Sequence, residues 1–314
     1  MAQQTWTFDA PTGTYKNHAL SKTLYESAIA KCITMDYVKP VSGFGKKSGE
    51  SVTLVRTSNI IEPSNGRLVE TERIPEYAWA LTTKVITVTE FGGSVPFTNL
   101  SNLLSEFNIE DPIQMALREQ MALVMDTTAM SAFKTAKVKY AITGLTTSTV
   151  TTNGVFGATS TANMNVFHAE EIRDLMFDTY FIPPWEGGDY IGIFRTRGIR
   201  GIKRDPTWEE WHKYTDPSAK YNGEVGRIEG IRFIECNHAN ALGNVGTGSV
   251  LGEGVVFGAD AVVMAEAMTP ELRAKQPEDY GRDLGVAWLG VFEFGIIWDT
   301  ANAGEARIVH VGSL

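Results

Sequence analysis

Residues 221–235 read YNGEVGRIEGIRFIE and place Gly223, Gly226 and Gly230 directly before an alternating apolar segment. Glycine-rich segments bind phosphate when they follow a strand and open a helix, or when they end in Gly-Lys-Ser or Gly-Lys-Thr. Here the glycines precede a predicted strand, IRFIE, and neither Lys-Ser nor Lys-Thr closes the run. The pattern therefore favours a backbone joint that leads into a strand over a loop that binds a nucleotide.

The overall composition excludes several classes of protein. The chain has 314 residues, of which 43% are hydrophobic, with a formal net charge of −9. This negative balance argues against a protein that coats nucleic acid, because such binding depends on Lys and Arg neutralising phosphates. Two cysteines, Cys32 and Cys236, are too few for a disulfide framework, so free thiols are expected. The sequence has no signal-peptide pattern and no apolar run of about 18 residues that predicts a membrane span.

The first hundred residues predict extended segments separated by loops. A polar arm precedes a predicted short helix around residues 24–29. Two predicted strands, 51–60 and 77–91, flank the segment 61–76, which carries Pro63, the turn pair Asn65-Gly66 and six charges. This order describes a long hairpin whose tip is too polar to lie in a core, so we expect the hairpin to lie on another surface.

A long helix is predicted for residues 111–136, with Asp111 as its N-cap and Pro112 at the first helical position. The helix carries two apolar stripes, so we expect it to make contacts on two sides. One stripe consists of Ile113, Leu117, Met121 and Val124, and the other of Met115, Ala122, Met125 and Ala129.

The remaining sequence predicts a second helix over 166–182, a short helix over 205–214, and several strands. Residues 143–163 are rich in Thr, Ser, Gly and Ala and predict a loop with short extended pieces. The predicted strands are 190–194, 231–235, 255–258 and a C-terminal pair, 283–299 and 305–311, separated by the turn-like TANAG. Strands precede and follow the helices without a βαβ rhythm, so the predicted class is α+β.

Three groups of residues could carry chemistry or binding. Cys236 and His238 could begin a zinc site, but the other histidines are scattered along the chain. Glu209 and Glu210 within WEEW supply the carboxylates of a glycoside hydrolase, yet adjacent helical residues point about 100° apart. The sequence has neither a serine nucleophile elbow nor HExxH. It therefore predicts no enzyme activity, no cofactor and no metal.

The segment RTRGIRGIKR, 195–204, is rich in cations and could contact phosphate. No aromatic residue interleaves it to stack on bases, and acidic residues follow at once. Ion pairing between subunits is favoured over contact with nucleic acid. The interface candidates in this segment are Arg195, Arg197 and Arg200.

Taken in order, these features resemble the major capsid proteins of tailed bacteriophages with the Hong Kong 97 fold. The resemblance covers nearly the whole chain. It is most specific in YNGEVGRIEGIRFIE, in VVFGADAVVMAE at 255–266, and in the ending YGRDLGVAWLGVFEFGIIWDTANAGEARIVHV at 280–311. The first of these resembles the family's Gly-Glu-hydrophobic-Gly-Arg-x-x-Gly-hydrophobic-Arg-hydrophobic pattern in the axial domain.

The resemblance implies a division of the chain. The chain would begin with an N-terminal arm (1–45) and an extended loop (46–95). A peripheral domain (96–163) with the spine helix (111–136) and an axial domain (164–268) would follow. The last segment (269–314) would return to the peripheral sheet. The three glycines of the opening segment would then shape a loop and the start of a strand in the axial domain.

The implied function is structural. Hexamers and pentamers of the chain would form an icosahedral head that encloses double-stranded DNA without sequence preference, and the protein would be made in the bacterial cytoplasm and reside in the virion. The expected partners are other copies of the chain, a separate scaffolding protein and a portal, with decoration proteins left open. Charged hairpin residues are expected to contact a neighbouring subunit, namely Arg56, Arg67, Glu70, Glu72 and Arg73.

Two alternatives remain open at the level of sequence. The same fold could form a bacterial nanocompartment of the encapsulin type that encloses an enzyme. A protein of a different class, a hydrolase, could use Glu209 or Glu210.

Overall fold

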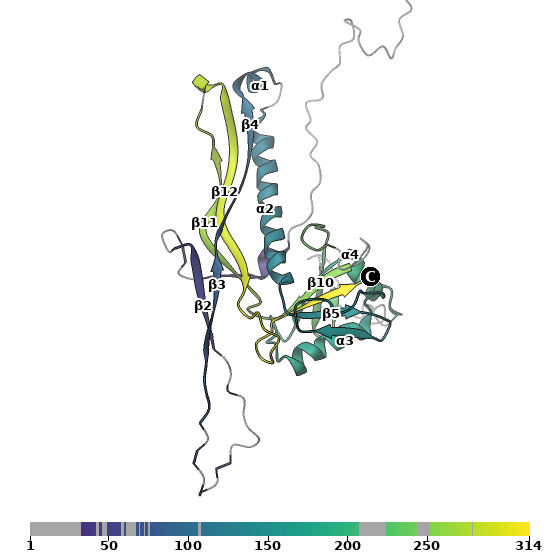
Figure 1. The fold of residues 1–314 in the computed structure, drawn as a ribbon. Coiled ribbons are helices and arrows are strands. Elements are labelled where there is room, and N and C mark those ends of the chain that lie inside the picture. Colours follow the sequence, from purple (N-terminus) through teal and green to yellow (C-terminus); the bar gives the residue numbers. More distant parts are fainter. Residues whose placement is uncertain are drawn as a thin grey trace, which may run out of the picture.

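The structure, a computed structural model, describes residues 33–314 except for 42–43, 46–48, 58–59, 61–66, 69, 72, 75, 106–107, 207–223, 244–251 and 278. Within this part the chain forms two larger sheets, a separate two-stranded hairpin and several helices. Figure 1 shows an elongated arm, a compact body beside its lower end, and a hairpin that projects away from both.

A four-stranded sheet and one long helix build the elongated arm. The strand order is β1 (Val38–Pro40), β11 (Val262–Ala274), β12 (Asp283–Ile296) and β4 (Thr89–Thr98). β1 is parallel to β11, and the other pairs are antiparallel. Helix α2 (Glu110–Lys134) runs alongside this sheet (Figure 1).

A seven-stranded mixed sheet forms the centre of the compact body. Its order is β6 (Ser148–Thr151), β5 (Val138–Ile142), β13 (Ile308–Ser313), β10 (Gly252–Phe257), β7 (Tyr190–Arg195), β9 (Ile231–Cys236) and β8 (Glu224–Ile228). Helices α3 (Val166–Asp174) and α4 (Thr196–Lys203) contribute Ile172, Ile199 and Ile202 to the apolar cluster on one face. Side chains of the opposite face, among them Ile193 and Phe257, join the cluster that contains the C-terminal half of α2.

The shorter elements complete the chain. They are the 3₁₀ turn η1 (Thr34–Tyr37), the hairpin strands β2 (Ser51–Thr57) and β3 (Leu81–Thr87), helix α1 (Asn99–Leu104), the π-helical turn η2 (Leu175–Thr179) and the turn η4 (Asp279–Gly281).

The glycine-rich segment is the backbone joint that its sequence predicts. Glu229 and Gly230, with φ angles of 47° and 76°, form the two-residue turn between β8 and β9. Both positions lie in the left-handed region, which suits glycine and matches the twist of a tight antiparallel hairpin. Gly226 sits where the register of β8 against β9 shifts. Gly223 lies outside the described residues.

The start of the long helix differs from the prediction. Asp111 is not the N-cap, because α2 begins at Glu110 and its N-cap is Ile109, without a side-chain cap hydrogen bond. The carboxylates of Glu110 and Asp111 lie in the first turn, where their negative charge interacts favourably with the positive end of the helix dipole. Asn108 lies just before the helix and bonds both residues: its Oδ1 accepts from the Glu110 amide at 3.3 Å, and its Nδ2 donates to Asp111 at 2.9 Å.

Strand pairing also departs from the prediction in two places. The predicted strand 77–91 is divided, so that β3 pairs with β2 whereas β4 pairs with β12. The two C-terminal strands do not pair with each other, since β12 lies in the four-stranded sheet and β13 lies between β5 and β10. Apolar alternation identifies a strand but does not specify its partner.

Both apolar stripes of α2 contribute to one core. Leu117, of the first stripe, is 2% exposed, and Ala129, of the second, is fully buried in the same cluster. Phe133, near the end of the helix, packs on Phe257 with ring centroids 4.6 Å apart. Met115, in the N-terminal half, is 45% exposed. The helix is therefore most deeply buried where the arm meets the compact body.

A buried polar network joins the end of α2 to the seven-stranded sheet. The Lys139 ammonium donates to the Lys134 carbonyl, in the last helical turn, and to Nδ1 of His310, both at 2.7 Å. His310 must then carry its proton on Nε2, which lies 2.7 Å from a Glu253 carboxylate oxygen. Burial lowers the pKa of Lys139 to about 8, against the opposing attraction of Glu253. The ammonium of Lys139, which lies on β5, thus caps the C-terminal end of α2.

A second buried carboxylate holds the segment at Ile33 and Thr34 against α2. Asp126, on α2, is fully buried and accepts hydrogen bonds from the amides of Ile33 and Thr34 at 3.2 and 2.9 Å. It also accepts from the Thr34 hydroxyl and from Nδ1 of His238, the latter at 3.0 Å. One side chain thus joins the N-terminal segment, the helix and the loop after β9.

We predict that Asp126→Ala lowers the free energy of unfolding by roughly 2–3 kcal/mol, because buried N–H donors lose their acceptor. Urea denaturation of the unassembled protein measures this change. Asp36→Ala, which removes an exposed carboxylate from the neighbouring turn η1, is the matched control and should change little. Equal stability of the two variants would show that Asp126 is not the anchor.

Candidate assembly surface

Within the part of the chain that the structure describes, the hairpin β2–β3 projects away from both larger sheets (Figure 1). Its strands are antiparallel and in continuous register from Ser51 opposite Thr87 to Thr57 opposite Leu81. Figure 1 shows that it extends beyond both larger sheets, in the direction opposite to α1. We call the strands β2 and β3 its root and the residues between them its tip. The root is partly buried, whereas the described tip residues, 60, 67–68, 70–71, 73–74 and 76–80, are exposed.

The root packs on the four-stranded sheet through one close approach. Ile86 of β3 is 4% exposed and lies in a small apolar cluster with Val263 and Ala265 of β11. A Cβ atom placed on Gly295 of β12 would lie 2.7 Å from Cδ1 of Ile86. Real Cβ atoms do not approach so closely, so a side chain at 295 would force the Ile86 side chain to move.

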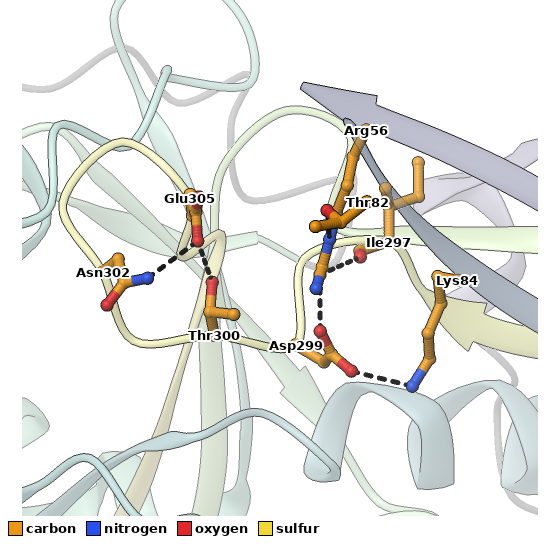
Figure 2. A network of polar contacts seen from close by, with 8 residues as sticks. All are labelled: Arg56, Thr82, Lys84, Ile297, Asp299, Thr300, Asn302 and Glu305. Atoms are coloured by element: carbon orange, nitrogen blue, oxygen red, sulfur yellow. Dashed lines mark hydrogen bonds and ion pairs between the residues drawn. The ribbon is translucent and has the colours of Figure 1, made fainter. Parts of the chain in front are cut away.

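A single carboxylate clamps both hairpin strands to the loop after β12 (Figure 2). Asp299 binds the Arg56 guanidinium of β2 at 2.5 Å and the Lys84 ammonium of β3 at 2.9 Å. Arg56 also donates to the Ile297 carbonyl at 2.9 Å and to the Thr82 hydroxyl at 2.8 Å. These bonds fix the orientation of the hairpin at its root.

The loop that carries Asp299 is braced from its other side. The Glu305 carboxylate accepts from the Thr300 hydroxyl at 2.6 Å and from the Asn302 amide at 3.0 Å (Figure 2). The loop is therefore closed on itself where it leaves β12 for β13.

The clamp shifts the pKa of its carboxylate. Partial burial alone would raise the pKa of Asp299, but hydrogen bonds and positive charge from Lys84 and Arg56 outweigh it and lower the pKa to about 2. The folded-state pKa is thus below the ordinary value of 3.8. The stabilisation is present above about pH 4 and is lost as the pH falls through about 2.

The tip exposes an unusual number of large apolar side chains. Ile74 is 66% exposed, Leu68 62% and Trp79 56%. Further exposed apolar side chains along the hairpin are Val55, Tyr77, Leu81 and Val85. Contiguous exposed apolar surface on a folded protein marks a binding surface, because water disfavours it.

The predicted interface residues of the hairpin lie in different environments. Arg56 belongs to the clamp, where its side chain is 14% exposed, so its main partner is Asp299 of its own chain. Arg67, Glu70 and Arg73 are exposed near the tip. Arg73 pairs with Glu76 at 2.9 Å, and both side chains remain largely exposed. Glu72 lies outside the described residues.

The cation-rich segment forms a helix that its sequence did not reveal. Arg195 ends β7 and donates to the Leu242 carbonyl at 2.9 Å. Arg197 and Arg200 are exposed on α4, whose Ile199 and Ile202 are buried. The alternation of cations with buried isoleucines was the available signal for this helix, but two glycines in the segment obscured it.

The residues considered for metal binding serve other roles. Cys236 is 1% exposed in the core, and His238 bonds to Asp126. No group of three or more His, Cys, Asp or Glu side chains in the described ranges could hold a metal ion. Glu209 and Glu210 lie outside the described residues. The described helices include none that is long and apolar enough to cross a membrane.

A groove of about 410 Å³ lies beside the clamp, between β3, the end of α2 and β12. Two of its charged lining residues, Lys84 and Asp299, bind each other. The groove separates the hairpin root from the helix.

Comparison with solved structures identifies the fold. The chain is similar to one from the acid-stable capsid structure of Helicobacter pylori bacteriophage KHP30, at a TM-score of 0.73 and 12% identity over 99% of each chain. The chain has a phage capsid fold. The capsid of cyanophage Pam1 contains a similar chain, at a TM-score of 0.71 and 13% identity, with 98% of this chain and 99% of that one covered.

The phage capsid fold extends to further solved structures. A chain of the Ralstonia phage GP4 capsid matches at a TM-score of 0.67 and 13% identity, over 99% of this chain and 98% of that one. No family model matches the sequence, and no curated protein matches it either. The predicted α+β class and Hong Kong 97-like fold are therefore confirmed by the comparison of structures, at identities of 12% to 13%.

We predict that Asp299→Asn loosens the hairpin root without unfolding the rest of the phage capsid fold. Backbone amides of β2 and β3 should exchange about tenfold faster at neutral pH, because a lost charge-assisted hydrogen bond weakens the local structure by about 1.5 kcal/mol. Hydrogen exchange read by mass spectrometry measures this change.

Asp279→Asn is the matched control, because Asp279 forms only a long, exposed ion pair with Arg282 at 3.6 Å. It should leave exchange in β2 and β3 unchanged. Unaltered exchange in Asp299→Asn would show that the apolar contacts of Ile86 alone hold the root.

Proposed function

We propose that this protein is the major capsid protein of a tailed bacteriophage. In this proposal copies of the chain assemble as hexamers and pentamers into an icosahedral head that encloses double-stranded DNA. The observation that carries the proposal is the match of nearly the whole chain to nearly the whole of chains from several phage capsids.

The exposed hairpin supports an assembling role. A monomeric protein rarely exposes Leu68, Ile74 and Trp79 together on a projecting element, since their burial is favourable. A standard protein interface removes about 1,600 Å² from water, and a hairpin laid on a neighbour would add to such a patch. Many contacts of this kind, repeated by symmetry, would stabilise a closed shell.

We assign the parts of the chain to the regions of a capsid subunit as follows. Residues 1–45 form the N-terminal arm, and 46–95 the extended loop, which contains β2 and β3. The elongated arm with α2 serves as the peripheral domain and the compact body as the axial domain. β5, β6 and β13 lie in the seven-stranded sheet of the compact body, and β11 lies in the four-stranded sheet of the elongated arm. We therefore assign a strand to the peripheral or axial domain by the sheet to which it belongs, and not by its position in the sequence.

We infer that the packaged DNA is held without strong attachment. The formal net charge of −9 disfavours a lumen that grips phosphates. The location in the virion, synthesis in the bacterial cytoplasm, and a separate scaffolding protein and portal belong to the same proposal, with decoration proteins as an open addition. No enzymatic activity is part of it.

A nanocompartment of the encapsulin type is the second candidate, because it would need the same exposed hairpin. A hydrolase that uses Glu209 or Glu210 is not favoured, since the similar chains come from capsid structures. Negative-stain electron microscopy of the purified protein distinguishes a shell from a monomer. Packaged DNA in particles from infected cells would distinguish a phage head from a nanocompartment.

We predict that Ile74→Ser combined with Trp79→Ser lowers the yield of shells by about tenfold or more, because two apolar anchors of one interface are lost. The fold of the isolated subunit should be retained, since both side chains are exposed. Circular dichroism measures the fold, and electron microscopy counts the particles.

Thr53→Ser, an exposed change on β2, is the control and should assemble normally. Charge reversal of Arg67, Glu70 and Arg73 should impair assembly less strongly, because exposed ion pairs contribute little. Shells at the normal yield from the Ile74 and Trp79 variant would contradict the proposed role of the hairpin.

A further inference from the structure

One side of the compact body carries a stripe of acidic and aromatic side chains. We call this the acidic-aromatic stripe; it follows α3 and the π-helical turn η2. The phenylalanines are 42%, 59% and 63% exposed, in chain order, and the acids are exposed as well. The members of the stripe are Phe167, Glu170, Asp174, Phe177, Asp178 and Phe181.

A second stripe, on α4, carries the opposite charge. We call this the cationic stripe; it consists of Arg197, Arg200, Lys203 and Arg204, all exposed. Lys203 pairs with Glu235 of β9 at 2.6 Å. Burial of Ile199 and Ile202 on the other side of the helix directs the cationic side chains away from the core.

Each stripe is electrostatically unfavourable when it is left alone. Like charges four residues apart on a helix destabilise it, and Glu170, Asp174 and Asp178 follow one another at that spacing. Arg173 pairs with Asp174 at 3.6 Å. Across the ranges that the structure describes, Glu170 and Asp178 form no ion pair, and neither do Arg200 and Arg204. A partner of opposite charge would relieve both stripes.

The two helices pack on one apolar cluster and adjoin where α3 begins and α4 ends, since the Val166 amide donates to Asp205 at 3.5 Å. From this junction the acids run away along α3 and η2, and the cations run away along α4, so most of each stripe is left to face outward. α3 is tied to the edge strand β6, where the Ser148 hydroxyl donates to Glu171 at 2.8 Å. α4 is tied to β9, next to the other edge, through Lys203 and Glu235.

The stripes also match in length and in chemistry. At a helical rise of 1.5 Å per residue, Glu170 to Asp178 spans about 12 Å and Arg197 to Arg204 about 10 Å. Guanidinium groups bind both carboxylates and aromatic faces. Arg173 already does so within the stripe, 5.3 Å from the ring centre of Phe177.

We propose that the acidic-aromatic stripe of one copy binds the cationic stripe of the next copy around a ring. Contact between two different surfaces of identical subunits is heterologous, and it closes into rings when the rotation permits. The inference rests on the proposed shell function and adds to it the residues of one contact within the hexamers and pentamers.

Charge reversal of each stripe tests the contact. One variant carries Asp174→Lys and Asp178→Lys, and the other carries Arg200→Glu and Arg204→Glu. Each alone should lower the yield of rings about tenfold or more, because like charges then meet at every contact. Native mass spectrometry and negative-stain electron microscopy of the full-length protein measure ring yield and subunit number.

An equimolar mixture of the two variants provides a sharper test. Where the two variants alternate, every contact joins opposite charges, so rings with an even number of subunits should form again. Rings with an odd number must contain at least one contact between like charges, so pentamers should remain scarce. A single chain that carries all four substitutions should form both kinds of ring.

A charge-matched control carries Glu90→Lys and Asp279→Lys, at exposed acids of the elongated arm. It should form rings at the normal yield. Equal loss in this control would overturn the inference, because net charge and not the contact would then be responsible.

The outcomes separate this inference from the function on which it rests. If the wild-type protein forms neither rings nor shells, the proposed function fails and the contact fails with it. If the wild type assembles but both variants assemble equally well, or if the mixture forms no even-numbered rings, the inference is overturned and the proposed function stands.

Discussion

The packing of Ile86 against Gly295 is the contact on which the arrangement of the projecting hairpin depends. It brings β3 so close to β12 that a side chain at position 295 would displace the side chain of Ile86. The Asp299 clamp then fixes the direction of the hairpin, since one carboxylate holds a cation from each strand. Together the two contacts fix the direction in which the hairpin leaves the four-stranded sheet.

The junctions between parts of the chain are made by buried charges that are fully bonded. Asp126 joins the N-terminal segment, α2 and the loop after β9, while Lys139, His310 and Glu253 join α2 to the seven-stranded sheet. Buried ionic groups contribute little net stability, but the loss of one partner is costly. Such groups suit junctions, because they specify a single relative placement of elements that apolar packing alone would leave less defined.

Negative and positive side chains are grouped on different parts of the surface, which the net charge of −9 alone does not reveal. Acids follow the exposed side of α3, and cations follow that of α4, and both helices pack on the same apolar cluster. The apolar tip of the hairpin is separate from both. In the proposed shell, a subunit with three such surfaces would contact several neighbours at once.

Local pattern by itself determined several elements of this protein. Alternating β-branched residues specified β2, β9 and β12, the absence of glycine and proline through most of α2 specified a long helix, and the glycines before β9 specified a joint and not a phosphate loop. The order of these elements also indicated the fold class, because an N-terminal arm, a long hairpin and a long helix, in this order, resemble one known family.

Tertiary structure alone decided which segments meet. The pairing of β13 with β5 and β10, the ion pairs of Arg56 and Lys84 with Asp299, and the bond from His238 to Asp126 join residues far apart in the chain. No local periodicity encodes such contacts, because they depend on how the sheets are packed in space. For the same reason the sequence places Arg56 among the exposed hairpin charges, whereas the structure shows that it binds Asp299 in the clamp. Likewise, the oppositely charged stripes on α3 and α4 can be recognised only when the position of both helices on the sheet is known.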